Sequence, residues 1–401
     1  MKNKKIVILA ILVAFAIPMS TQIPAAGIQN VAESFPDASE TTVALIVTLP
    51  ILVASLFALI AGKVAGSVIE FKKLILAALV FFTAGGVAPF FFSESLGLVL
   101  AFRVVCGIGI GLLSPLGATL VVKLIDSEEA QGKAMGIGSI VLNISGIVYV
   151  SLAGALADSH WSNMFLVYLV GLLFIPIIIF TLPNIPLEKD TKEEVTATKE
   201  RINFAMIAIA LMCFLMAILE YPVHLNMSSV VITENLGTSA TAGIIIAMYT
   251  IGGIVGSAIY ARFSKLTKDY TTSAARLITA GGLLILFFGG NATILAMGNF
   301  LIGLSFGIYY PAFYMLMGRA APASLTALGM SLIMVGYDGG GFVSPYFFSV
   351  VRKVTGNEGV RFPFLFSSIA FTAVTLIVVM ITRKRPLIPA NTTSVEEKAK
   401  E

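Results

Sequence analysis

Three ionisable side chains, Arg103, Glu220 and Asp338, stand inside long runs of apolar residues. A charged side chain at membrane depth costs roughly 2.5–3.5 kcal/mol even on a lenient insertion scale, and it usually faces an interior cavity or a partner. A carboxylate shielded from water can load and release a proton near neutral pH. A guanidinium stays charged, so Arg103 can hold an anion, bias a neighbouring carboxylate, or tie helices together through carbonyls and Asn or Gln amides. These three residues are the first candidates for a functional site.

The surroundings of the two carboxylates differ. Glu220 is followed by Tyr221, Pro222 and His224, and a proline frees a carbonyl where a helix can bend. Counted from residue 202 it is expected roughly 27 Å along its helix, toward the outer end, where an acid can also simply be solvated. Asp338 lies roughly 20 Å from the near edge of its helix and precedes a run of three glycines. Asp338 can carry a proton, bind a cation, or pair with Arg103 as a gate.

Other polar and aromatic residues in the apolar runs are candidate pocket liners. A tyrosine combines stacking area with a hydroxyl, which suits aromatic or amphipathic ligands. His224 can serve the site or bond at the membrane interface. The candidates are Gln22, Asn143, Tyr149, Tyr221, His224, Tyr309, Tyr310, Tyr314 and Tyr337.

Composition identifies a polytopic helical membrane protein. The chain has 401 residues, of which 57% are hydrophobic and 12% charged, and apolar runs of about 18–25 residues recur along it, each long enough to cross a bilayer. The N-terminal run is predicted to be a first membrane helix and not a cleaved signal peptide, because it continues without a small-residue exit. Scattered basic residues argue against nucleic acid binding, and Cys106 and Cys213 are expected to be unpaired buried thiols.

Twelve membrane helices are predicted, with both termini in the cytoplasm. They divide into a six-helix bundle over 1–183 and another over 202–383, separated by a charged linker at 184–201 and followed by a tail at 384–401. All but four of the 26 Lys and Arg residues then lie at the cytoplasmic side, as the positive-inside rule requires. The predicted spans are 5–28, 41–62, 73–93, 96–122, 133–157, 163–183, 202–225, 239–262, 274–291, 293–317, 325–349 and 362–382.

The two halves repeat. Residues 100–115 match residues 296–311, so Gly107 and Gly111 correspond to Gly303 and Gly307, while Arg103 is replaced by Asn299. The four glycines are expected to pack helices closely. Residues 134–146 likewise match 327–339. Two parallel six-helix repeats predict a site between them near the midplane and an alternating-access architecture.

With these spans and motifs the sequence resembles the major facilitator superfamily, over nearly the whole chain. The run Arg103-x-x-x-Gly107-x-Gly109-x-Gly111 is similar to the motif of that family's fourth helix. The STQIP run around Gln22 is similar to the twelve-span drug:proton antiporters, which often carry an acid at the Gln22 position. The resemblance implies a transporter and not an enzyme.

Two family motifs are altered. The stretch from Gly62 to Lys73 resembles the gate loop after the second helix, but Gly66 and Ser67 replace its acid and base; Gly62, Lys72 and Lys73 remain as gating candidates. In the fifth helix, Tyr149-Val150 stands where the antiporter motif has Gly-Pro.

We therefore predict a secondary transporter of the cell membrane that exports a small amphipathic or cationic compound in exchange for protons, with sodium as the alternative coupling ion. The alternative is a symporter or uniporter that takes up a small organic anion held by Arg103. The chain has no ATP-binding motif, and its two histidines and two cysteines are not spaced for a nucleophile–base pair or a metal site. We expect no enzymatic activity, metal or cofactor, with the lipid bilayer and the substrate as partners and a monomer as the working form.

Overall fold

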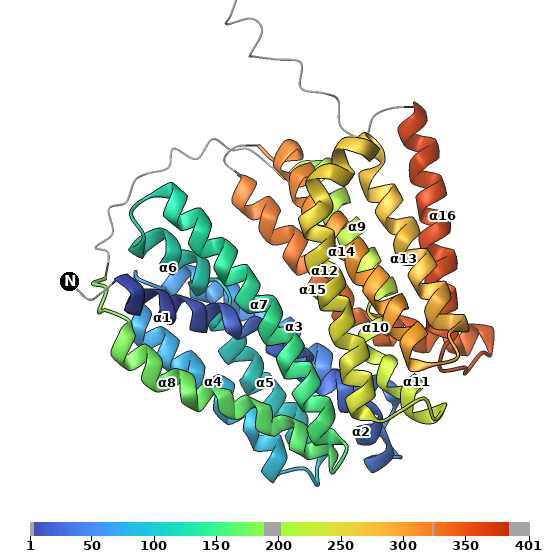
Figure 1. The fold of residues 1–401 in the computed structure, drawn as a ribbon, viewed down its shortest axis with the longest axis horizontal. Coiled ribbons are helices and arrows are strands. Elements are labelled where there is room, and N and C mark those ends of the chain that lie inside the picture. Colours follow the sequence, from blue (N-terminus) through green and yellow to red (C-terminus); the bar gives the residue numbers. More distant parts are fainter. Residues whose placement is uncertain (1–3, 188–201, 323–324, 385–401) are drawn as a thin grey trace, which may run out of the picture.

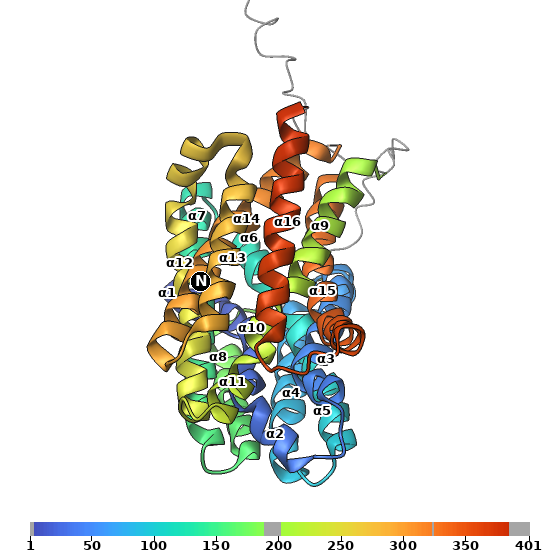
Figure 2. The same cartoon turned by 90° about the vertical axis from the view of Figure 1, so that its right-hand side faces the viewer.

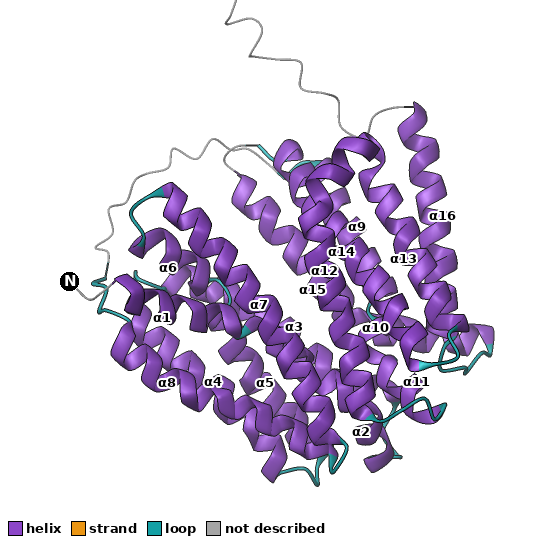
Figure 3. Ribbon diagram, in the orientation of Figure 1, coloured by secondary structure: helices purple, strands orange, loops and turns teal. Residues whose placement is uncertain are grey.

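A computed structural model describes residues 4–187, 202–322 and 325–384. Nearly all of this part of the chain is helical, and it contains no strand (Figure 3). The predicted linker falls mostly, and the predicted tail almost entirely, outside the described residues.

The first six predicted spans all correspond to helices. Three of them are single helices, and the first, fourth and sixth are broken into consecutive segments. The segments are α1 (Lys4–Ala16), η1 (Pro18–Gly27), α2 (Ile28–Ser34), α3 (Glu40–Val64), α4 (Phe71–Phe91), α5 (Leu96–Leu113), α6 (Leu116–Leu124), α7 (Glu128–Ala157), η2 (Trp161–Leu169) and α8 (Val170–Thr181).

The last six spans also correspond to helices, and the seventh is broken into three segments. These are α9 (Phe204–Glu220), α10 (Pro222–Leu225), α11 (Met227–Thr233), α12 (Ser239–Thr267), η3 (Lys268–Tyr270), α13 (Thr271–Phe288), α14 (Ala292–Ala320), α15 (Thr326–Thr355) and α16 (Phe362–Lys384). The predicted all-helical class with two six-helix repeats is confirmed.

Eleven helical spans in the described residues are long and apolar enough to cross a membrane. The eleventh predicted span corresponds to α15, which is 30 residues long but is not among them. It contains Asp338 and the three glycines after it, besides several hydroxyl-bearing residues. Polar residues in a spanning helix usually face protein or a cavity. The composition of α15 therefore indicates a helix whose polar side faces the protein interior.

The seventh span runs further than predicted. The predicted helix ended at residue 225, whereas the helical path continues to Thr233 and spans 30 residues in all. Pro222 lacks a backbone N–H and begins a new segment, so α9 ends at Glu220 without ending the membrane crossing. Glu220 therefore lies near the middle of its span and not toward its end.

The two halves meet at one end of the molecule and diverge at the other. Figure 1 shows most of α1 to α8 on the left and α9 to α16 on the right, splayed apart toward the top, with α2 at the bottom beneath α10 and α11. Figure 2 shows the second half face on. We call the end at which α8 stops and α9 begins the linker end, and the opposite end the far end. Between the halves, α7 packs on α12 and α3 packs on α15.

Polar contacts join the halves at the far end. The Asp158 carboxylate, just past α7, accepts hydrogen bonds from the Thr238 hydroxyl (2.8 Å) and the Ala240 backbone N–H (3.1 Å), and so caps the N-terminus of α12. The Ser239 hydroxyl donates to the Asn30 side chain (2.6 Å). One half thus satisfies the open helix end of the other.

Glycines bring helices within each half into close contact. A Cβ atom on Gly107 would lie 2.8 Å from the Pro50 carbonyl oxygen of α3, and one on Gly111 would overlap the Ala54 carbonyl oxygen. A Cβ on Gly303 would overlap the Tyr249 carbonyl oxygen of α12. The repeated glycines therefore pack the fourth helix of each half against the second helix of the same half.

We expect Gly303→Ala to lower the stability of the protein. The added methyl must displace the α12 backbone, and overpacking of this kind typically costs about 1–3 kcal/mol. Gly281→Ala on α13 is the matched control, because no atom lies within 4 Å of its Cβ position. Thermal unfolding in detergent should show a lower midpoint for Gly303→Ala alone. Equal midpoints would contradict the close-packing interpretation.

Candidate functional site

Arg103 is completely buried and is held by neutral groups of its own half. Its Nε donates to the Ile46 carbonyl oxygen of α3 (2.8 Å) and its Nη1 to the Tyr168 hydroxyl of η2 (2.7 Å). The Tyr168 hydroxyl in turn donates to the Ser20 carbonyl oxygen of η1 (2.8 Å). The guanidinium carbon lies 5.3 Å from the Tyr168 ring centre and 5.9 Å from that of Phe165, within the range of cation–π attraction.

This network connects four membrane spans of the first half through one side chain. Nη2 of Arg103 has no hydrogen-bond partner, so the guanidinium keeps one free donor. No carboxylate from the described residues lies within ion-pair distance of it. The structure therefore separates Arg103 from Glu220 and Asp338, and its contacts are those of a residue that ties helices together.

Glu220 is also completely buried, and tyrosines supply both of its contacts. The Tyr249 hydroxyl of α12 donates to Oε1 (2.5 Å), and the Tyr309 hydroxyl of α14 donates to Oε2. Both carboxylate oxygens are thus paired with neutral donors, and no cation from the described residues forms an ion pair with them.

A layer of aromatic rings surrounds this carboxylate. The His224 ring lies 4.7 Å from the Tyr249 ring and 5.5 Å from the Tyr221 ring, and His224 Nδ1 has no partner. The Phe306 ring bridges Tyr249 (5.6 Å) and Tyr337 (5.5 Å). Edge and offset contacts at these distances are the favoured arrangements of aromatic pairs. We call Glu220, Tyr221, His224, Tyr249, Phe306, Tyr309 and Tyr337 the tyrosine cluster.

Asp338 follows Tyr337 on α15 and makes its contact across the two halves. The Ser55 hydroxyl of α3 donates to Oδ2 of Asp338. Ser55 also donates to the Ile51 carbonyl oxygen (3.2 Å), so its single proton is shared between the two acceptors. A carboxylate of one half is thereby held by a hydroxyl of the other, at a depth between the far-end contacts and the open linker end.

The remaining pocket candidates lie in three environments. The Gln22 side chain lies beside Tyr221 with its Oε1 unpaired, so it reaches the tyrosine cluster from the first half. Tyr314 contacts Tyr310 (3.4 Å between hydroxyl oxygens), whose ring lies 5.6 Å from that of Tyr337. The other two lie on α7: Asn143 donates to the Ser139 carbonyl oxygen (2.8 Å), and Tyr149 lies beside the Ser145 side chain.

The three gating candidates act within the first half in this conformation. Lys72 donates to the Ile179 carbonyl oxygen near the C-terminus of α8 (2.7 Å), where cations and open carbonyls attract each other. Lys73 pairs with Glu70 (3.0 Å) on the surface. A Cβ placed on Gly62 would meet no atom within 4 Å.

Three partners in the site, and one buried arginine outside it, escaped sequence analysis. Ser55, Tyr168 and Tyr249 are single polar residues in apolar helices, and only the tertiary contacts distinguish them from other such residues. Arg276 was assigned to a cytoplasmic helix edge, but it is completely buried and donates to the Thr272 carbonyl oxygen (3.0 Å). Its position five residues inside α13 was the available signal.

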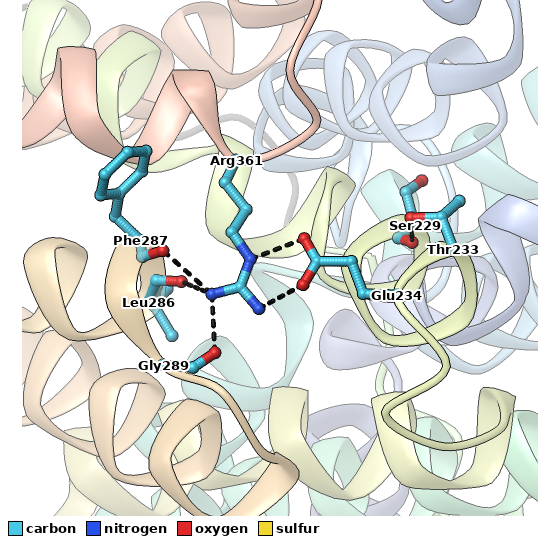
Figure 4. Close-up of polar contacts among 7 residues, drawn as sticks. All are labelled: Ser229, Thr233, Glu234, Leu286, Phe287, Gly289 and Arg361. Carbon is cyan, nitrogen blue, oxygen red and sulfur yellow. Dashed lines mark hydrogen bonds and ion pairs between the residues drawn. The ribbon is translucent and has the colours of Figure 1, made fainter.

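At the far end of the second half, Arg361 joins several spans through a set of bonds that we call the latch. Arg361 forms a bidentate ion pair with Glu234 (2.7 and 2.5 Å), and its Nη1 donates to the carbonyl oxygens of Leu286, Phe287 and Gly289 (2.7–3.0 Å), as Figure 4 shows. These carbonyls end α13, where no intrahelical donor remains. The latch therefore joins three spans of the second half into one body.

Comparison with known proteins identifies the family. The model of the Major Facilitator Superfamily matches residues 8–345, and a second match covers residues 209–400. The chain belongs to this superfamily. No curated protein sequence matches the chain.

Solved transporters share the fold at low identity. A bacterial homologue of the human lysosomal transporter Spinster, inward-facing and unoccupied, is 15% identical with a TM-score of 0.70, over 95% of this chain and 96% of that one. A D-xylose–proton symporter is 15% identical (TM-score 0.71; 97% and 99% covered). A transporter of the POT family is 11% identical (TM-score 0.73; 96% and 99% covered). The protein is thus a multi-pass membrane protein with a transporter fold.

We expect Tyr168→Phe to destabilise the first half without changing substrate affinity. The variant leaves the Ser20 carbonyl oxygen unpaired and Nη1 of Arg103 with only the Cys106 sulfur at 3.6 Å. A buried group left without its partner costs about 1–3 kcal/mol. Thermal unfolding should show the loss, and Tyr260→Phe, on the half-buried part of α12, should leave the midpoint unchanged. A large rise in the half-saturating substrate concentration with normal stability would instead make Arg103 a ligand clamp.

Proposed function

We propose that the protein is a proton-coupled secondary transporter that exports a small amphipathic or cationic compound by alternating access. One observation carries the proposal: Glu220 is completely buried among hydroxyls and aromatic rings, with no cation of the described residues beside it. A desolvated carboxylate without a countercharge gains from binding a proton or a cationic ligand. The rings around it suit a cation or an amphipathic compound.

The direction of coupling follows if a proton and a cationic compound compete for the same carboxylate. A carboxylate that accepts either a proton or a cation cannot hold both at once. Exchange of the two on opposite sides of the membrane is antiport, and an inward proton gradient then drives the compound out. Sodium could replace the proton by the same argument, because it too neutralises the carboxylate.

Asp338 is the residue that we propose to link ligand binding to movement. Its contact with Ser55 crosses the boundary between the halves, so a proton or cation on Asp338 weakens an interaction that holds them together. Rocking of residues 1–183 against 202–383 would then expose the site to alternate sides.

The side assignment rests on the distribution of basic residues. We propose that the protein lies in the cell membrane. By the positive-inside rule, the linker end and both termini would then face the cytoplasm. The far-end contacts then close the outer side, and the described conformation is inward-facing. A single chain contains both halves and the proposed site, so we propose a monomer as the working form.

Anion uptake through Arg103 has less support. Arg103 is fully enclosed by the first half and already bonds to Ile46 and Tyr168. An anion would have only Nη2 to bind unless these contacts broke. The solved relatives that are proton symporters share the fold alone and do not decide between the two directions.

Proton movement in proteoliposomes tests the proposal. With an internal pH dye and a panel of lipophilic cations and small organic acids, addition of a transported cation should change the internal pH. The change should fall to background in Asp338→Asn and Glu220→Gln, because neither amide can exchange a proton. Glu94→Gln, an exposed acid in a far-end turn, is the matched control and should transport normally.

Two results would contradict the proposal. Undiminished coupling in Asp338→Asn and Glu220→Gln, with both variants inserted and folded, would remove the carboxylates from the mechanism. A response to organic acids alone, lost in Arg103→Lys, would establish anion uptake instead.

A further inference from the structure

A separate cavity of about 520 Å³ lies at the far end, away from the tyrosine cluster. Its walls come from both halves, namely from α2 and α3 on one side and from α10, α11, α15 and the turn before α16 on the other. This volume is within the usual range of small-molecule sites, about 300–1,000 Å³. The charged residues that line it are Glu40, Arg352, Lys353 and Glu358.

Arg352 is the buried cation of this cavity. Its side chain is 8% exposed, and its Nε has no hydrogen-bond partner. Its Nη1 atom forms an ion pair with the carboxylate of Glu40 at the beginning of α3. A buried guanidinium presents its donors in a planar fork, and an unused Nε means that the fork is only partly filled.

Glu40 is in the opposite situation. Its side chain is 80% exposed, so water can solvate its carboxylate when Arg352 is not available. An exposed acid adds little to the stability of an ion pair. Breaking the ion pair therefore costs Glu40 little, because water solvates it, whereas the buried Arg352 still requires a carboxylate. Another carboxylate can take the place of Glu40.

We propose that this far-end cavity binds a small soluble carboxylate, which takes the place of Glu40 on Arg352. A ligand carboxylate can engage Nε and Nη2 side by side, an arrangement that fills the unused donor, and its charge then competes with the Glu40 carboxylate on Nη1. Lys353, next in the chain and also lining the cavity, adds a second positive charge. Glu40 and Glu358 balance these two positive charges, so the site suits a single carboxylate better than a dianion.

Ligand binding there also has a consequence for the halves. Glu40 belongs to α3 and Arg352 to α15, so their ion pair joins the two halves at the far end. A carboxylate bound to Arg352 releases Glu40 and weakens this connection. The cavity is thus placed to sense a compound on the side that the far end faces. This inference stands on the far-end cavity alone and does not require the proposed proton coupling.

Binding of benzoate to the full-length protein in phosphatidylcholine nanodiscs tests the site by calorimetry. The wild type should bind benzoate and not methyl benzoate, which lacks the charge. Glu40→Gln removes the internal competitor and should tighten binding by about fivefold, as expected for an exposed pair. Arg352→Gln should abolish binding, and Glu40→Gln keeps the test valid if Arg352→Gln fails to fold.

Glu358→Gln is the matched control, because it removes the same charge from the same cavity without releasing Arg352. It should change the affinity less than twofold. Equal tightening in Glu358→Gln and Glu40→Gln would overturn the assignment to Arg352, and so would the absence of benzoate binding in both wild type and Glu40→Gln. Nanodiscs that contain phosphatidylserine distinguish a lipid carboxylate from a soluble one. If phosphatidylserine competes with benzoate for the cavity, a lipid headgroup supplies the carboxylate, and the proposal of a soluble ligand is overturned.

Discussion

The absence of water from the bilayer interior is the constraint on which this structure depends, because every polar group there must find its partner within the protein. The first half meets it with Arg103, whose bonds to Ile46 and Tyr168 join several spans. The second half has Asn299 at the repeated position, buried with neither amide atom paired. It places its charge instead at Glu220, among tyrosine hydroxyls. The halves thus share a fold but divide the polar groups differently.

Contacts within the halves are more extensive than those between them. Arg361 alone makes five bonds inside the second half, and the glycines of α14 bring it against the backbone of α12. Between the halves the polar contacts are single hydroxyl bonds, one helix cap at Asp158 and the Glu40–Arg352 pair. Groups of helices that are internally latched and joined by exchangeable contacts move as bodies.

The boundary between the halves also organises the proposed chemistry. Asp338 on Ser55 lies at its middle, and Arg352 on Glu40 lies at its far end. Both are acid contacts that cross from one half to the other, and we propose that a bound ion or ligand replaces them. A compound that exchanges with either contact changes the free energy of the closed far end, which is what couples binding to conformation.

Sequence alone determined the membrane class, the twelve helices and the repeat, because span length, apolar content and glycine spacing are local properties. It also singled out Glu220 and Asp338, since an acid in an apolar run is rare. It did not reveal Ser55, Tyr168 or Tyr249, because a lone hydroxyl in a helix has no partner until distant helices pack. Nor did it show that Arg103 lies apart from both acids, or that Glu220 lies mid-span beyond a proline break. Only tertiary packing decides which buried polar groups meet, because it brings together helices far apart in the chain.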